Sequence, residues 1–262
     1  MDDRPIGMFD SGFGGLTVAR AVMDLLPGEQ LVYLGDTARY PYGPRPLGEV
    51  SGFAHQIARE LVEGRGSKML VVACNTAAAA ALESLRDRFD VPVIGVVEPG
   101  ARAALDATVT GRVGVIGTVG TISSGAYQHA LSDDCELVPL ACPGFVEFVE
   151  RGEFDSPQVH VLAQRLLAPA IDAKVDTLLL GCTHYPYLAR TISDVMGTDV
   201  VLVSSSDETA FEVSRVLGEM DLLAPGPGSA SFITTGDVNS FEELGRTLLG
   251  PELASAEQVT FP

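Results

Sequence analysis

The chain has 262 residues, of which 17 are basic and 35 acidic, giving a formal net charge of −18. That charge repels nucleic-acid backbones and anionic membrane surfaces, and no apolar run is long enough to span a bilayer, so we expect neither partner. The N-terminal residues lack the basic start and cleavage site of a secretory signal, and the four cysteines form no CxxC pair. We therefore predict a cytoplasmic protein without a disulfide framework.

Short β-branched runs alternate with Ala- and Leu-rich stretches, which is typical of parallel strands joined by helices. In chain order the expected strands are Pro5–Phe9, Leu31–Gly35, Met69–Ala73, Val91–Val96, Val113–Gly117, Cys135–Leu140, Thr177–Gly181 and Asp199–Val203. Beyond Ser206 we expect a helix over Thr209–Met220 packed on the first half of the chain, a strand over Ala230–Thr234, and a helix over Ser240–Leu249.

The first four strands align with the second four at nearly constant offsets. The aligned pairs are Ile6 with Val113, Leu31 with Leu137, Val93 with Val200, and Cys74 with Cys182. This predicts an α/β protein of two similar, pseudo-symmetric lobes, each a parallel-type sheet flanked by helices, with the active site in the cleft between them. We place one lobe at 1–97 plus 207–262 and the other at 98–206. A chance alignment of loosely defined strands is the alternative.

Cys74 and Cys182 each follow an apolar strand and precede a hydrogen-bonding pair, Asn75-Thr76 and Thr183-His184. We predict that both lie at helix N-termini, where free N–H groups lower a thiol pKa. Two matched thiols facing each other suit a reaction that removes a proton from one face of a carbon and returns it to the other. The alternative for each cysteine is a small buried hydrophobic side chain.

The turn after the first strand, Asp10 to Thr17, is rich in glycine, so its backbone N–H groups can approach an anion. It lacks both nucleotide-binding fingerprints, because Thr17 stands where a third glycine belongs and no Gly-Lys-Ser/Thr follows. Asp10 suits an ammonium group or a proton relay, or else a helix N-cap.

A metal site is not expected, although Cys182, His184 and Cys74 offer ligand atoms, because no fourth ligand repeats in both motifs. His55, His129 and His160 are interpreted as surface residues, and Cys135 and Cys142 as core residues.

The chain resembles the glutamate racemases of the aspartate/glutamate racemase family over essentially its full length. The motifs that carry the resemblance are Phe9–Leu16, Gly35-Asp36, Pro41–Gly43, Cys74–Ala77 and Gly181–Pro186. Two local departures are Ala78 and Pro46, where the family often has serine.

The resemblance implies roles for individual residues. Cys74 and Cys182 carry the proton, Asp10 and His184 assist the thiols, and Glu150 matches an acidic position near the site. Glutamate is held by Asp10, Ser11, Tyr42, Gly43, Asn75, Thr76, Thr118, Thr121, Thr183 and His184. The resemblance further implies supply of D-glutamate for peptidoglycan and hence for cell wall and shape, no cofactor or metal, and a homodimer.

Alternative functions stay open at this point. Aspartate is the rival substrate within the family. A regulatory protein that binds DNA gyrase, or a thiol redox protein that bridges Cys74 and Cys182, would be a different class.

Overall fold

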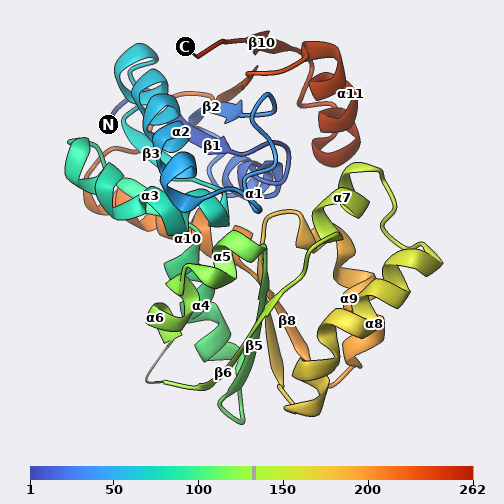
Figure 1. The fold of residues 1–262 in the computed structure, drawn as a ribbon. Helices are drawn as coiled ribbons and strands as arrows, with labels where there is room; N and C mark the ends of the chain where they lie inside the picture. Colours follow the sequence, from blue (N-terminus) through green and yellow to red (C-terminus); the bar gives the residue numbers. More distant parts are fainter. Residues whose placement is uncertain (132–133, 262) are drawn as a thin grey trace.

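Two parallel sheets form the framework of the protein, which is shown in Figure 1 as a computed structural model that describes residues 1–131 and 134–261. The six-stranded sheet has the order β10-β9-β2-β1-β3-β4, and the four-stranded sheet has the order β6-β5-β7-β8. The strands of the first are β1 (Ile6–Asp10), β2 (Gln30–Gly35), β3 (Met69–Val72), β4 (Val93–Gly95), β9 (Ser229–Thr234) and β10 (Ala256–Gln258). Those of the second are β5 (Arg112–Gly117), β6 (Glu136–Ala141), β7 (Thr177–Gly181) and β8 (Val201–Ser204).

Helices flank both sheets. They are α1 (Leu16–Leu25), α2 (Leu47–Arg59) continued by a π-helical turn η1 (Glu60–Gly64), α3 (Asn75–Arg88), α4 (Val97–Ala107), α5 (Val119–Ser123), α6 (Ala126–Leu131), α7 (Phe145–Glu150), α8 (Pro157–Asp172), the 3₁₀ helix η2 (Tyr185–Leu188), α9 (Ala189–Met196), α10 (Ser205–Glu219) and α11 (Val238–Leu249). The central strands β1, β3 and β7 are buried at every position, because helices cover both faces of their sheets. The predicted fold class is confirmed.

The internal repeat is visible in the strand order, because β2-β1-β3-β4 of the first sheet corresponds to β6-β5-β7-β8 of the second. The registers also correspond. Ile6 pairs with Leu31 and Met69, and Val113 pairs with Leu137 and Thr177.

One predicted alignment is wrong by two residues. Val93 pairs with Leu70, and the equivalent of Leu70 in β7 is Leu178, whose partner is Leu202 rather than Val200. Side chains on a strand alternate between its two faces, so residues two apart lie on the same face. A shift of two residues therefore leaves the apolar pattern unchanged, and the pattern did not reveal the error.

The segment after β8 connects the lobes. Helix α10 contacts α1, as predicted, and also α4, and the largest buried cluster includes Val113 and Leu179 of the second sheet. The short edge strand β10 was not predicted. The boundaries 1–97 plus 207–262 and 98–206 stay a proposal. Among the described residues, no helix is both long and apolar enough to cross a membrane.

Candidate active site

A cavity of about 100 Å³ lies where the carboxyl ends of strands from both sheets meet. The residues that line it lie at the end of a strand, in the loop that follows the strand, or in the first turn of the next helix. They include Asp10 at the end of β1 and Ser11 after it, Tyr42 and Gly43 after β2, Cys74, Asn75 and Thr76 after β3, Thr118 after β5, and Cys182, Thr183 and His184 after β7. Pockets for drug-sized ligands are about 300 Å³ or more. This cavity is smaller, so it suits a smaller molecule.

Cys74 occupies the N-cap of α3, where its Sγ accepts a hydrogen bond from the Ala77 backbone N–H at 3.5 Å. The position agrees with the prediction, but the predicted lowering of its pKa is wrong. Burial raises the pKa of the thiol, and so does the negative charge of Asp10, to about 12, which outweighs the Ala77 N–H and a hydrogen bond with Ser11. Cys74 is therefore a neutral thiol near pH 7.

Cys182 lies in a different local setting from Cys74. The helical segment that follows it begins with the 3₁₀ turn η2, which continues into α9 and whose N-cap is His184. Cys182 therefore lies two residues before the N-cap and not at the helix N-terminus that was predicted for it. The nearest polar group is instead the imidazole, with His184 Nδ1 3.9 Å from the Cys182 Sγ.

His184 is almost completely buried, and its Nε2 lies 3.2 Å from Glu150 Oε1 at the end of α7. Burial alone lowers the pKa of an imidazole, but hydrogen bonds with Cys182 and Glu150 raise the pKa of His184 to about 10. His184 is therefore an imidazolium near pH 7, held between a sulfur and a carboxylate. Glu150 does not itself line the cavity but contacts a residue that does.

Asp10 is completely buried at the end of β1. Its Oδ1 accepts the Gly12 backbone N–H at 2.8 Å, and its Oδ2 accepts the Thr183 hydroxyl of the other lobe at 3.2 Å. The interpretation of Asp10 as a helix N-cap is wrong, because α1 begins at Leu16 and its N-cap is Gly15.

Hydroxyl and amide groups on and next to the cavity wall form hydrogen bonds with one another. Thr76 Oγ1 lies 2.9 Å from Thr118 Oγ1 and 3.2 Å from Thr121 Oγ1, which joins the lobes. The Asn75 Oδ1 accepts the Tyr127 hydroxyl at 2.6 Å. Within the described part of the chain, its buried Nδ2 has no hydrogen-bond partner, so it is a donor available to a ligand.

The lobes also touch through backbone at the cavity rim, where the Gly120 N–H donates to the Gly43 carbonyl at 2.8 Å. A Cβ on Gly120 would lie 2.9 Å from that carbonyl oxygen, so only glycine permits this approach. Tyr42 lines the cavity, and its hydroxyl donates to the buried Asp36 carboxylate.

Ten lining residues were not predicted as site residues, and Cys142 and Tyr40 are two of them. Cys142 is buried, as predicted for a core residue, but it also lines the cavity just after β6, and burial and nearby Cys182 raise its pKa to about 12. Tyr40 lines the cavity too, its ring centroid 6.3 Å from that of His184. Position directly after a strand is the signal that could have identified Cys142.

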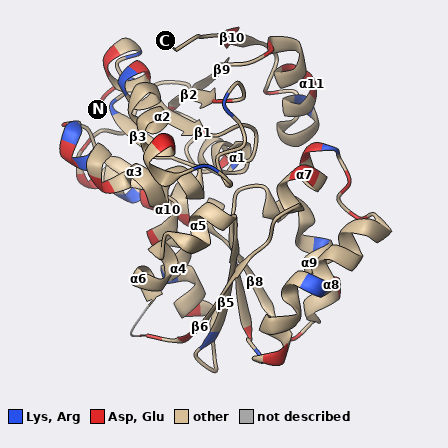
Figure 2. Ribbon diagram, in the orientation of Figure 1, with Lys and Arg blue, Asp and Glu red and all other residues tan. Residues whose placement is uncertain are grey.

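Acidic residues are spread over both lobes (Figure 2), and the cavity lining contains Asp10 and Glu147 but, among the described residues, no Lys or Arg. Among the described lining residues, the positive charge comes from the imidazolium of His184.

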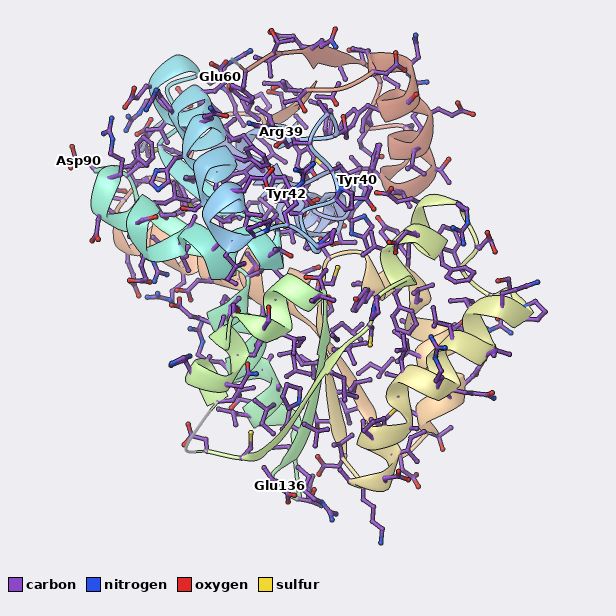
Figure 3. The ribbon with its side chains drawn as sticks, viewed as in Figure 1. Arg39, Tyr40, Tyr42, Glu60, Asp90 and Glu136 are labelled. Carbon is purple, nitrogen blue, oxygen red and sulfur yellow. The ribbon has the colours of Figure 1, made fainter. Side chains whose placement is uncertain are left out.

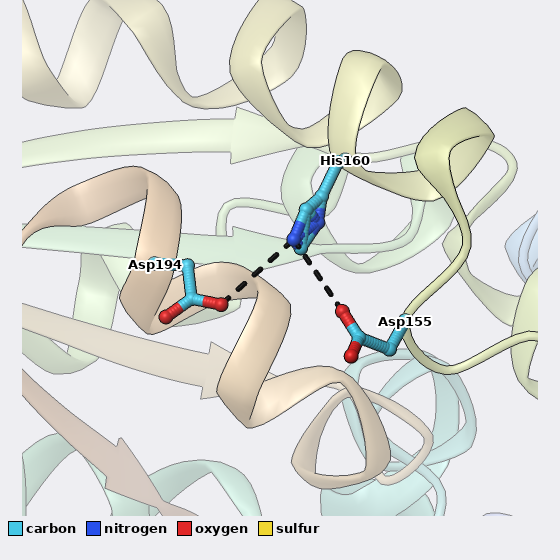
Figure 4. A group of neighbouring side chains, drawn as sticks. All are labelled: Asp155, His160 and Asp194. Carbon is cyan, nitrogen blue, oxygen red and sulfur yellow. Dashed lines mark ion pairs between the residues drawn. The ribbon is translucent and has the colours of Figure 1, made fainter.

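One group of described residues brings three potential metal ligands together, Asp155, His160 and Asp194 (Figure 4). His160 Nε2 lies 3.5 Å from Asp155 Oδ1 and 3.8 Å from Asp194 Oδ2. None of the three lines the cavity, and both carboxylates are exposed, so we interpret them as a surface ion-pair cluster.

Known proteins share both the sequence and the fold. The Asp/Glu/Hydantoin racemase family matches residues 16–210. A glutamate racemase from Parafrankia sp. is 52% identical over 97% of this chain and 94% of its own length. The crystal structure of a glutamate racemase from Bacillus anthracis superposes with a TM-score of 0.96 at 43% identity, covering 100% of this chain and 99% of that one. A Francisella tularensis glutamate racemase, solved in complex with D-glutamate, has a TM-score of 0.92 at 33% identity, covering 99% and 98%.

Fold and site thus define a two-lobed α/β enzyme with a small-molecule site between its lobes. The chain belongs to the Asp/Glu/Hydantoin racemase family. It is an amino-acid racemase, and therefore an isomerase.

Proposed function

We propose that this chain interconverts L- and D-glutamate without a cofactor, by transfer of the Cα proton between Cys74 and Cys182. The observation that carries the proposal is that both thiols line one cavity, each just beyond the carboxyl end of one of two equivalent strands, β3 and β7. Racemisation needs a base on one face of Cα and an acid on the other. Matched thiols from facing lobes supply both.

In the proposed cycle Cys74 begins as a neutral thiol, in keeping with its raised pKa of about 12. Cys182 is the base in this direction, and its Sγ lies 3.9 Å from Nδ1 of His184, whose pKa is about 10. The Cys182 thiolate takes the Cα proton of one enantiomer, and the Cys74 thiol donates its proton to the opposite face. The products are the other enantiomer, a Cys182 thiol and a Cys74 thiolate, from which the reverse reaction begins. Asp10 beside Cys74 and His184 beside Cys182 assist these proton transfers.

The proposed substrate contacts follow from the polarity of the wall. The Asp10 carboxylate suits the ammonium group, and neutral donors suit the carboxylates, among them the free Asn75 Nδ2. The proposed set is Asp10, Ser11, Tyr42, Gly43, Asn75, Thr76, Thr118, Thr121, Thr183 and His184. Because glutamate racemases are the relatives at 52% identity, and one relative was solved with D-glutamate, we propose glutamate rather than aspartate.

The test is racemisation in deuterated water. From either enantiomer of glutamate, the wild-type chain should incorporate deuterium at Cα while optical rotation decays to zero, and aspartate should react far more slowly. C74A and C182A should each lose racemisation, because one base can exchange the proton but cannot invert the centre. C135A is the matched control, since Cys135 is half-buried and is not a lining residue of the cavity. Full activity in C74A or C182A would refute the two-base mechanism.

The proposed cellular role is supply of D-glutamate for peptidoglycan, and the proposed assembly is a homodimer. Growth of a D-glutamate auxotroph expressing this chain without added D-glutamate tests the role. Light scattering coupled to size-exclusion chromatography tests the assembly.

A further inference from the structure

Asp36 is a buried carboxylate that the proton transfer does not use. It directly follows β2, has no solvent exposure, and its backbone N–H donates to the Asp10 carbonyl at 3.0 Å. Burying a carboxylate costs free energy unless its oxygens are hydrogen-bonded. The hydrogen-bond donors to Asp36 therefore show which parts of the chain it connects.

Three side chains donate to the Asp36 carboxylate. Arg39 Nε lies 3.1 Å from Oδ1 and 2.8 Å from Oδ2, and the Thr235 hydroxyl lies 2.7 Å from Oδ1. The third donor is the Tyr42 hydroxyl, on Oδ2. Figure 3 shows Arg39 and Tyr42 close together in the loop between β2 and α2.

Arg39, one of the three donors to Asp36, is itself packed against two aromatic rings. Its guanidinium carbon lies 4.2 Å from the Phe53 ring centroid and 5.0 Å from that of Phe261. Asp36 is thereby tied to α2, to the segment after β9, and to the C-terminal end of the described chain.

The loop that Asp36 holds forms one wall of the cavity. Tyr40, Pro41, Tyr42, Gly43 and Pro44 all line it, and Gly43 contacts the second lobe through Gly120. Tyr42 is a lining residue whose hydroxyl donates to Asp36, so it joins this wall to the buried carboxylate. The position of this wall therefore depends on the Asp36–Tyr42 hydrogen bond.

The geometry points to Asp36 as a positioning residue, whose buried carboxylate fixes the cavity wall at residues 40–44 through the hydroxyl of Tyr42. The inference rests on the proposed function, because the wall is proposed to hold the carboxylates of glutamate. Asp36 itself touches no substrate.

The test compares D36N with D176N. Asp176 is a matched control, because its carboxylate accepts hydrogen bonds from the Thr108 hydroxyl and from the Val109 and Thr110 backbone N–H groups but does not line the cavity. D36N should raise KM for both glutamate enantiomers about tenfold, the loss expected from about 1.4 kcal/mol, with a smaller change in kcat. D176N should lower stability and leave KM within about twofold.

Y42F removes only the hydroxyl that binds Asp36, and it serves if D36N does not fold. It should reproduce the rise in KM, and the double variant should lose no more than D36N alone, because both changes break one hydrogen bond. Additive losses, or equal KM changes in D36N and D176N, overturn the inference.

Hydrogen exchange separates this inference from the proposed function. Backbone amides of residues 37–45 should exchange faster in D36N and Y42F than in D176N, whether or not glutamate is turned over. If the wild-type enzyme racemises glutamate but D36N leaves the exchange of residues 37–45 unchanged, the positioning role alone is refuted. If the wild-type chain cannot racemise glutamate, but residues 37–45 still exchange faster in D36N and Y42F than in D176N, the proposed function alone is refuted.

Discussion

Replacing Glu150, the hydrogen-bond partner of His184, should change the pKa of His184 by an amount that can be worked out from the structure. The pKa of His184 is about 10 against an ordinary value of 6.5, a difference of about 5 kcal/mol in favour of the imidazolium. His184 is only 3% exposed, so solvent screens these contacts little. Hydrogen bonds with Cys182 and Glu150 both contribute, and the change E150Q removes the charge of one partner.

A hydrogen bond to a charged group contributes about 1.5–3 kcal/mol, so E150Q should lower the pKa of His184 by about 1 to 2. If the new value is about 8.5, the protonated fraction at pH 9 falls from about nine-tenths to about a quarter. The alkaline limb of kcat/KM should move to lower pH accordingly, because the proposed Cys182 thiolate loses its positive neighbour sooner.

Two assays measure this effect, an NMR titration of the imidazole and the pH profile of racemisation. E147Q is the matched control for the NMR titration, since Glu147 also lies on α7 and is not a hydrogen-bond partner of His184 among the described residues. If His184 titrates at the same pH in E150Q as in the wild type, the reasoning is refuted.

The same shift has a consequence for stability. Because the folded-state pKa of His184 lies above the unfolded value, its contribution is fully present below about pH 6.5 and is lost as pH rises to about 10. The wild type should therefore lose more stability than E150Q over that range, as measured by urea unfolding at several pH values.

Three further changes test the packing around the site and the core. K68M should cost about 3–5 kcal/mol in urea unfolding, because it leaves Glu29 buried without the ammonium now 2.6 Å away; adding E29Q should recover part of that loss, and a cost near zero contradicts the account. G14A should lower kcat/KM at least about tenfold, since its Cβ would lie 2.4 Å from both His184 Nδ1 and Thr183 Oγ1; wild-type activity would show that the loop has room. Y127F should cost about 1–3 kcal/mol by leaving Asn75 Oδ1 unpaired, and an unchanged urea midpoint would count against that bond.

Much of the fold could be predicted because parallel strands buried on both faces have a strong sequence signal. Runs such as Thr177–Gly181 are apolar and end at the residues that line the cavity, and the repeat offset aligned Cys74 with Cys182, which line that one cavity. The three residues of the edge strand Ala256–Gln258 are half-buried or exposed and have no apolar pattern, so the sequence did not predict a strand there.

The chemistry of the site was less predictable, because electrostatics depend on what packs around a group. The position of Cys74 at a helix N-terminus was predicted, but not that burial and Asp10 reverse the effect on its pKa. Cys182 follows the same strand pattern, yet Tyr185-Pro186 begins a 3₁₀ turn, so an imidazole and not a helix end is its polar neighbour. The Asp36–Tyr42 bond joins two residues whose motifs were noted separately.

A crystal structure with glutamate bound tests the central claim most directly. The sulfurs of Cys74 and Cys182 should approach Cα from opposite faces, each about 3–3.5 Å from Cα. Both sulfurs on one face, or either one turned away from Cα, would contradict it.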